Sequence, residues 1–296
     1  MTSSPVLITD RSPSTARQPR LAIGEWILAL GIAALLLPTL LRLAQLSWST
    51  EAGAHGPIVF ATGLWLLWRD RAALQLAVRR PFLPAGLALV VLLPLYAVGR
   101  ITSVLMIESL SLYGVLITLA YLRWGEAVIR RLWFPIFYGL FLITPPENWI
   151  FVLTRPIKVL LSTGAVDLLA WAGFAIGSTG SMIQIEGYQL LVATACSGIN
   201  SLIGISAISL FYVYLRHDDA PRYALVLTVL VLPIAVLTNF ARIIILILVT
   251  YWFGEDIAQG IAHEAAGILM FVLALTLFLA LDTVLHPLFR RLGWTR

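Results

Sequence analysis

Three polar residues of a very apolar chain, Cys196, Arg242 and His263, have the side chains needed for nucleophilic catalysis. The chain is 60% hydrophobic, and Cys196 is its single cysteine. A thiolate is a strong nucleophile and an imidazole can serve as its general base, while a guanidinium stays charged and can stabilise a thiolate or an oxyanion. Ionisable groups are costly at membrane depth, so each marks a candidate functional site. Together these residue types predict a cysteine acyl-transfer site, if the fold brings them together.

Taken singly, each of these residues has an ordinary structural explanation. A cysteine among small residues often packs between helices. An arginine near the end of a membrane span usually extends to the lipid headgroups, and a histidine at a helix start can be an interfacial or capping residue. Asn239, three residues before Arg242, can cap a helix or form a hydrogen bond between helices. The catalytic hypothesis therefore depends on the combination and on the topology.

Residues next to the three would support the same reaction. Ser197 and Gly198 stand at the expected start of a helix, where their backbone amides are candidate oxyanion donors and the helix dipole favours a thiolate. Ser197 is also a rival nucleophile, but no lysine or aspartate is obviously placed to activate it. His263-Glu264 begins like the helix of a zinc protease but lacks the second histidine. We therefore expect no metal site and no cofactor.

The composition is that of a single integral membrane domain. Only 12% of the residues are charged, and the mean hydropathy is +0.92. A single cysteine excludes an internal disulfide framework. The net charge of +5 mainly reports orientation in a membrane protein, so we expect no nucleic-acid partner.

The elements that must position the three residues are about eight transmembrane helices in an all-α polytopic fold. The predicted spans are 21–45, 57–68, 82–99, 102–122, 132–144, 198–215, 224–241 and 264–284. Most of the arginines fall on alternate loops, and the positive-inside rule makes that side cytoplasmic, together with both termini. The predicted units are a cytoplasmic tail over 1–20, one transmembrane domain over 21–286 and a basic cytoplasmic tail over 287–296.

This topology places Cys196, Arg242 and His263 at the outer face of the membrane. The apolar segment Ile243–Phe253 is too short to cross and return, so it is either re-entrant or a tilted continuation of the span before it. The largest outer segment begins with Pro145-Pro146, which ends a helix. Residues 149–174 then have the pattern of interfacial helices, and 177–192 alternate as in a short β-hairpin that leads to Cys196.

Three motifs in this order resemble the exosortase/archaeosortase family. They are Ala195-Cys196-Ser197-Gly198-Ile199-Asn200, then Asn239-Phe240-Ala241-Arg242, then His263-Glu264 followed by Gly267. His55-Gly56 and the proline pair Pro145-Pro146 are weaker matches. The resemblance covers roughly residues 50–283, and it is densest over 140–275.

The resemblance implies a multi-pass cysteine protease or transpeptidase in which Cys196 is the nucleophile and Arg242 and His263 complete the triad. Its substrates would be exported proteins with a C-terminal sorting signal, which consists of a short motif (often Pro-Glu-Pro), an apolar helix and a basic tail. The enzyme would lie in the bacterial cytoplasmic (inner) membrane, in contact with lipid, with its site facing the periplasm. It would be linked to exopolysaccharide or envelope biogenesis.

Several residues outside the triad have open roles at this stage. His55, Arg155 and Lys158 are candidates for lining the substrate site. The basic Arg155 and Lys158, with Arg242, could attract an acidic residue of the signal, while His55 is either structural or substrate-lining and is not expected to be catalytic. Glu108 is an intramembrane acid whose partner is Arg100, Arg242 or a nearby hydroxyl such as that of Ser109 or Ser111.

Two functions of other classes compete with the protease hypothesis. A transporter would use Arg242, His263 and Glu108 as a polar pathway, but it would also predict internal pseudo-symmetry, and the sequence has no visible repeat. A non-catalytic exopolysaccharide assembly factor would leave the three polar residues individually replaceable. The substrate, the acceptor group and the oligomeric state are not specified by the sequence.

Overall fold

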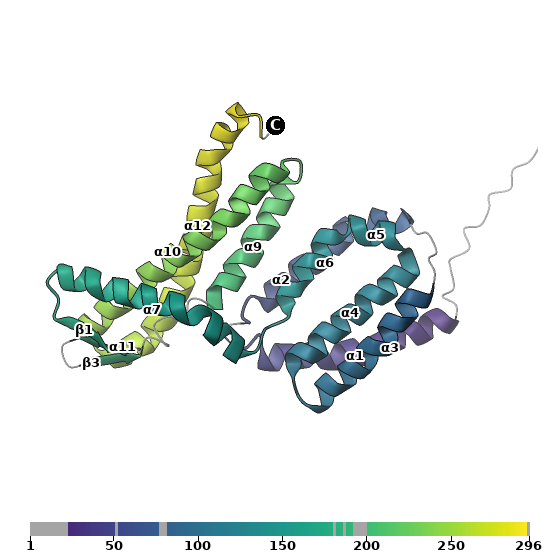
Figure 1. Ribbon diagram of the computed structural model, residues 1–296, viewed down its shortest axis with the longest axis horizontal. Helices are drawn as coiled ribbons and strands as arrows, with labels where there is room; N and C mark the ends of the chain where they lie inside the picture. The colour runs from purple at the N-terminus through teal and green to yellow at the C-terminus, as the bar shows by residue number, and fades with distance from the viewer. Residues whose placement is uncertain are drawn as a thin grey trace, which may run out of the picture.

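The protein is built almost entirely from helices (Figure 1). The computed structural model describes residues 23–50, 53–76, 82–179, 182–185, 188–191 and 200–294. The N-terminal helices are α1 (Ile23–Leu46), α2 (Gly56–Arg69), α3 (Phe82–Ile101), α4 (Leu105–Trp124), α5 (Glu126–Arg131) and α6 (Trp133–Gly139), with 3-10 turns η1 (Arg71–Leu76) and η2 (Leu140–Leu142). They are followed by α7 (Glu147–Trp171), a small sheet, and α9 (Asn200–His217), α10 (Pro221–Phe253), α11 (Glu255–Gln259) and α12 (Ile261–Arg291).

Helices α3 and α4 of the N-terminal group pack against each other as a hairpin. Gly99 makes this approach possible, because a Cβ at Gly99 would lie 2.5 Å from the backbone nitrogen of Glu108. The turn between the helices contains Ser103 at φ 59°, a conformation that few residues other than glycine adopt.

The segment predicted to lie outside the membrane forms, in its described part, one long helix and a three-stranded antiparallel sheet. The strands β1 (Ile176–Thr179), β2 (Met182–Ile185) and β3 (Tyr188–Leu191) pair in the order β1-β2-β3. The predicted hairpin over 177–192 is thus a meander of three short strands, and α7 is a single helix. Ile183 and Ile185 point to the same face of β2, where both are fully buried. They pack with residues of α7 and α10, including Leu161 and Leu246.

The C-terminal helices α9, α10 and α12 form a bundle (Figure 1). Their shared core contains Val213 of α9, Tyr223 and Leu227 of α10, and Phe278 of α12. The segment Ile243–Phe253 continues α10 without a break, so α10 has 33 residues and is about 50 Å long. Of the two alternatives for this segment, the structure therefore selects the continuation.

The two helix groups meet along α2, α6 and α9. Val59 and Leu66 of α2 pack with Phe134 and Tyr138 of α6 and with Ala207 of α9. This cluster holds α9, which follows the cysteine motif, against the N-terminal helices.

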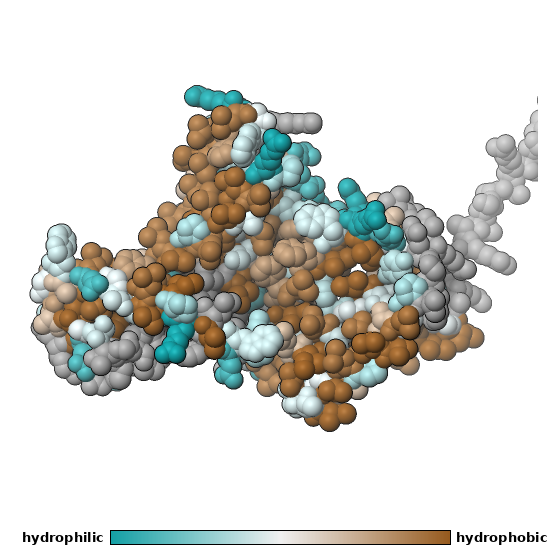
Figure 2. Space-filling view, in the orientation of Figure 1, coloured by the Kyte–Doolittle hydropathy of each residue, from teal (hydrophilic) through white to brown (hydrophobic). Residues whose placement is uncertain are grey.

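The surface has the apolar character of a multi-pass membrane protein. Five described helices are long and apolar enough to cross a membrane: Ile23–Leu46, Pro84–Ile101, Leu105–Trp124, Pro221–Phe253 and Ala265–Arg291. Figure 2 shows hydrophobic residues over much of the visible face, and exposed side chains such as Val90, Val229 and Ile268 fit contact with lipid. The all-α polytopic fold is confirmed. The count of eight spans and the sidedness of the termini stay predictions.

Candidate functional site

Arg242 lies inside the C-terminal bundle. Its side chain is on α10, and the residue is 3% exposed, although it follows a long apolar run that would suit a lipid-facing helix. A narrow cleft between α9, α10 and α12 surrounds it. The lining residues are Ile205, Ala235, Thr238, Asn239, Arg242, Gly267, Met270 and Phe271. The arginine of the second motif is therefore held between helices, which differs from the expected position of an arginine that extends to headgroups.

Gly267 links the second motif to the third. A Cβ at Gly267 would lie 3.6 Å from Nη2 of Arg242, so the backbone of α12 passes directly beside the guanidinium. Position 263 lies one helical turn before Gly267, because residues four apart share a helix face. The helix that carries His263 thus runs past Arg242, although the side chain of His263 lies outside the described part of the chain.

The cysteine motif precedes the third helix of the cleft. α9 begins at Asn200, and Ile205 in its second turn lines the cleft with Arg242. Cys196 precedes Asn200 by four positions in the sequence, which limits the distance between their Cα atoms to about 14 Å. Cys196, Ser197 and Gly198 lie outside the described residues, so their contact with Arg242 remains a prediction.

His55 connects the N-terminal group to this region. Its Nε2 lies 3.0 Å from the carbonyl oxygen of Phe141 and donates to it, while Gly204 of α9 is so close that a Cβ there would be 3.1 Å from the Cβ of His55. Burial lowers the pKa of His55 below its ordinary value, although the bond to Phe141 opposes this shift. His55 thus lies next to the helix that follows the cysteine, and its role in lining the substrate site stays a prediction.

Arg155 and Lys158 lie on α7, outside the cleft of Arg242. Arg155 is exposed and Lys158 is half-buried. α7 contacts α10 through its other face, where a Cβ at Gly164 would be 3.6 Å from the ring of Phe240. A role of these two cations in attracting a substrate stays a prediction.

Glu108 is paired at a distance from Arg242. Its carboxylate is fully buried, accepts a hydrogen bond of 2.9 Å from Arg100 and one of 2.9 Å from Thr39, and forms an ion pair with Arg42. Among the alternatives, Arg100 is correct and Arg242 is wrong. The hydroxyl of Ser109 is bonded to the carbonyl of Leu105. Sequence reasoning missed Arg42 and Thr39, because only the packing of α1 against α4 brings them to Glu108.

A second buried acid, Asp282, was also missed. Its carboxylate accepts hydrogen bonds of 2.6 Å from both Tyr212 and Tyr223 and lies 3.1 Å from Nε2 of His217. The cluster joins the C-terminal part of α12 to the end of α9 and the start of α10. An aspartate within a long apolar run was the signal available in the sequence.

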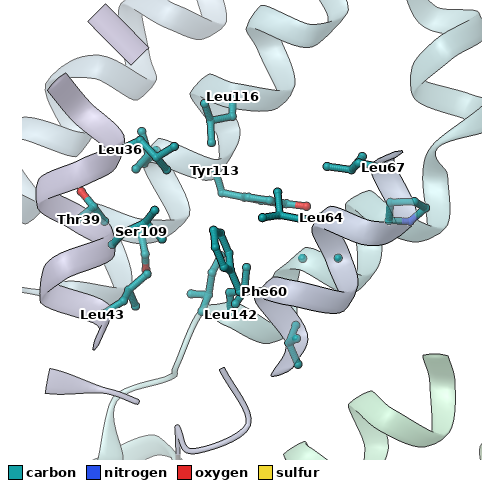
Figure 3. Close-up of a pocket in the computed structure, with 17 residues that line it drawn as sticks. Leu36, Thr39, Leu43, Phe60, Leu64, Leu67, Ser109, Tyr113, Leu116 and Leu142 are labelled. Carbon is teal, nitrogen blue, oxygen red and sulfur yellow. The ribbon is translucent and has the colours of Figure 1, made fainter. Parts of the chain in front are cut away.

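An apolar cavity of about 220 Å³ lies in the N-terminal group, away from the site (Figure 3). Leu36 and Leu43 of α1 face Phe60 and Leu64 of α2 across it, and Tyr113 of α4 contributes one of its few polar groups. No residue of the Arg242 cleft lines it.

Residues 48–280 match the family model of the transmembrane exosortase. The chain belongs to the exosortase family. No curated protein and no solved structure is significantly similar to it. Members of this family are membrane-embedded sorting transpeptidases that act on proteins with sorting signals. The matched region includes all three motifs, every helix from α2 to α11 and most of α12.

Proposed function

We propose that this exosortase cleaves C-terminal sorting signals of exported proteins through a triad of Cys196, His263 and Arg242. The observation that carries the proposal is the burial of Arg242 at 3% exposure between α10, α9 and α12. These are the helices that bear the second motif, follow the first and begin with the third. A charge is expensive to bury, so a position between these particular helices calls for a functional explanation.

The reaction follows from the properties of the three side chains. His263 takes the proton of the Cys196 thiol, and Sγ attacks the carbonyl carbon of the scissile peptide bond. The tetrahedral intermediate collapses when the C–N bond breaks, and His263 returns the proton to the leaving amine. A thioester on Cys196 remains, and water or an amine acceptor then releases it. Arg242 stabilises the thiolate or the oxyanion and stays protonated throughout.

The substrate class follows from the family and from the apolar surface. A sorting signal with its own apolar helix would lie in the bilayer beside the exposed apolar faces of the spans, which would bring its motif to the level of Arg242 on α10. We infer a periplasm-facing site in a bacterial cytoplasmic membrane and a role in exopolysaccharide or envelope biogenesis.

The test compares C-terminal peptides of envelope proteins by mass spectrometry between cells that carry the wild type and cells that carry Cys196→Ala. We expect a set of proteins to keep its C-terminal apolar helix in the variant alone. Ser209→Ala is the matched control, because Ser209 is a small buried residue of α9 outside the cleft and its loss leaves the nucleophile intact.

Identical peptide profiles for the wild type and Cys196→Ala, at equal protein levels, would remove the cysteine from the mechanism. In that case the transporter or the assembly factor becomes the better explanation. Added mass on the new C-termini would identify the acceptor and distinguish transfer from hydrolysis.

A further inference from the structure

Asn239 has a buried side chain with no hydrogen bond to any described residue. The residue is 4% exposed, and neither Oδ1 nor Nδ2 has a partner within the described part of the chain. Burying a polar group without a partner is unfavourable, so natural proteins keep few of them and each requires an explanation. An amide that is unpaired at both ends is a group held ready for a ligand.

The cleft gives this amide a defined neighbourhood. Asn239 precedes Arg242 by three residues, so both point to the same face of α10, and both line the cleft. The other walls are mainly apolar, with Ile205 of α9 and Met270 and Phe271 of α12. In such a setting a hydrogen bond is stronger than in water, because the local dielectric is low.

Thr238, the neighbouring polar residue, is already engaged. Its hydroxyl donates within α10, at 3.0 Å from the carbonyl of Ile234 and 3.1 Å from that of Ala235. Asn239 is therefore the neutral donor of the cleft that is available to a ligand. The cleft has free space of about 10 Å³, which is room for about one water molecule or one oxygen atom.

We propose that Asn239 is an oxyanion donor of the acyl-transfer reaction, a catalytic residue in addition to the triad. The inference rests on the proposed function. As Sγ of Cys196 bonds to the scissile carbon, the π electrons of the carbonyl move to its oxygen, which accepts a hydrogen bond from Nδ2 of Asn239 beside the positive charge of Arg242. When the C–N bond breaks, the carbonyl re-forms and this hydrogen bond weakens.

The physical reason is that such donors act where charge develops. A carboxamide binds the oxyanion more strongly than the carbonyl that precedes it, so it lowers the barrier without tighter binding of the substrate. Loss of one side-chain donor of this kind typically costs 10²–10³-fold in kcat. A residue that only held the peptide in place would change KM instead.

The test uses Asn239→Leu, which keeps the volume of the side chain and removes its donor. The purified full chain in detergent is assayed with a substrate identified by the C-terminal peptide comparison. We expect kcat to fall roughly 10²–10³-fold with KM little changed. Thr250→Val is the matched control, because Thr250 is a fully buried residue of α10 outside the cleft, and its kcat should stay at the wild-type value.

A second readout separates catalysis from structure. The rate at which iodoacetamide alkylates Cys196 reports the thiolate, and it should be the same in Asn239→Leu and the wild type, because the amide acts on the substrate oxygen. Wild-type kcat in Asn239→Leu would overturn the inference, as would a fall in the alkylation rate parallel to the fall in kcat. Processing that survives in Cys196→Ala would instead refute the proposed function. Loss in Cys196→Ala with full kcat in Asn239→Leu would refute the inference alone.

Discussion

At the scale of single residues, the N-terminal group depends on one carboxylate shared by two cations. Glu108 is fully buried, while the side chains of Arg42 and Arg100 are 20% and 39% exposed. Burying a carboxylate is costly unless it is paired and hydrogen-bonded, and here Thr39 completes its bonding. The sequence brought Arg100 into consideration because it lies eight residues away across one turn. Arg42 is 66 residues away, and the sequence around neither residue predicts their contact.

The Glu108→Gln variant should lower the free energy of unfolding by about 2 kcal/mol. The amide keeps an acceptor for Thr39 but leaves two arginines without their counter-charge, and the partial exposure of both moderates the loss. Thermal unfolding in detergent measures the effect. Glu126→Gln is the control, since the Glu126–Arg130 pair is exposed and such pairs contribute at most about 1 kcal/mol. Equal shifts for the two variants would contradict this account.

At the scale of elements, α3 and α4 are held together by close backbone packing, and α9, α10 and α12 are joined by polar contacts. Gly99 lets α3 lie against the backbone of α4. Asp282, bonded to Tyr212 and Tyr223, joins α9, α10 and α12 at the ends far from Arg242 and so fixes how these helices can slide. The sequence predicted most helices because long apolar runs are unmistakable. It missed the third strand, because the 16-residue alternating stretch resembles a single hairpin.

A Gly99→Ala substitution should open the α3–α4 hairpin and destabilise the protein. The added Cβ would meet the backbone of Glu108, which cannot move aside as a flexible side chain can, and overpacking of this kind costs about 1–3 kcal/mol. The same thermal assay measures it. At Gly31 of α1 a Cβ meets nothing within 4 Å, so Gly31→Ala should be neutral or slightly stabilising. An unchanged unfolding temperature for Gly99→Ala would contradict the close packing of α3 against the backbone of α4.

At the scale of the whole molecule, the described helices follow the predicted spans in order along the chain. The assignment of each loop to one side of the membrane rests on the arginine pattern alone. The structure describes the surroundings of Arg242 and Asn239. Cys196 and the side chain of His263 lie outside the described residues. Cys196, Arg242 and His263 could be identified from the sequence, because each lies in a short motif and the three motifs follow in the order typical of the family. No sequence pattern could show that Arg242 is buried rather than extended to headgroups, because that depends on how three distant helices meet.

Single-cysteine labelling in a Cys196→Ala background tests the topology. Ser103→Cys, in the turn between α3 and α4, should react with a membrane-impermeant maleimide in intact spheroplasts. Asp218→Cys, in the turn between α9 and α10, should react only after the membrane is permeabilised. Both positions are exposed, so accessibility on the protein does not limit the reaction. The reverse pattern would invert the orientation and place the site in the cytoplasm.

The position of Arg242 along α10 fixes its height above the start of that helix. Arg242 lies about 21 residues beyond Pro221, a rise of about 32 Å along an upright helix, and the hydrocarbon core of a bilayer is about 30 Å thick. With Pro221 at its predicted place on the cytoplasmic side, a substrate of the proposed kind, whose own helix crosses the same bilayer, would present to Arg242 only the few residues just beyond its apolar stretch. The enzyme would choose its bond by height above the membrane as well as by side chains, so signals of different sequence can share one spacing.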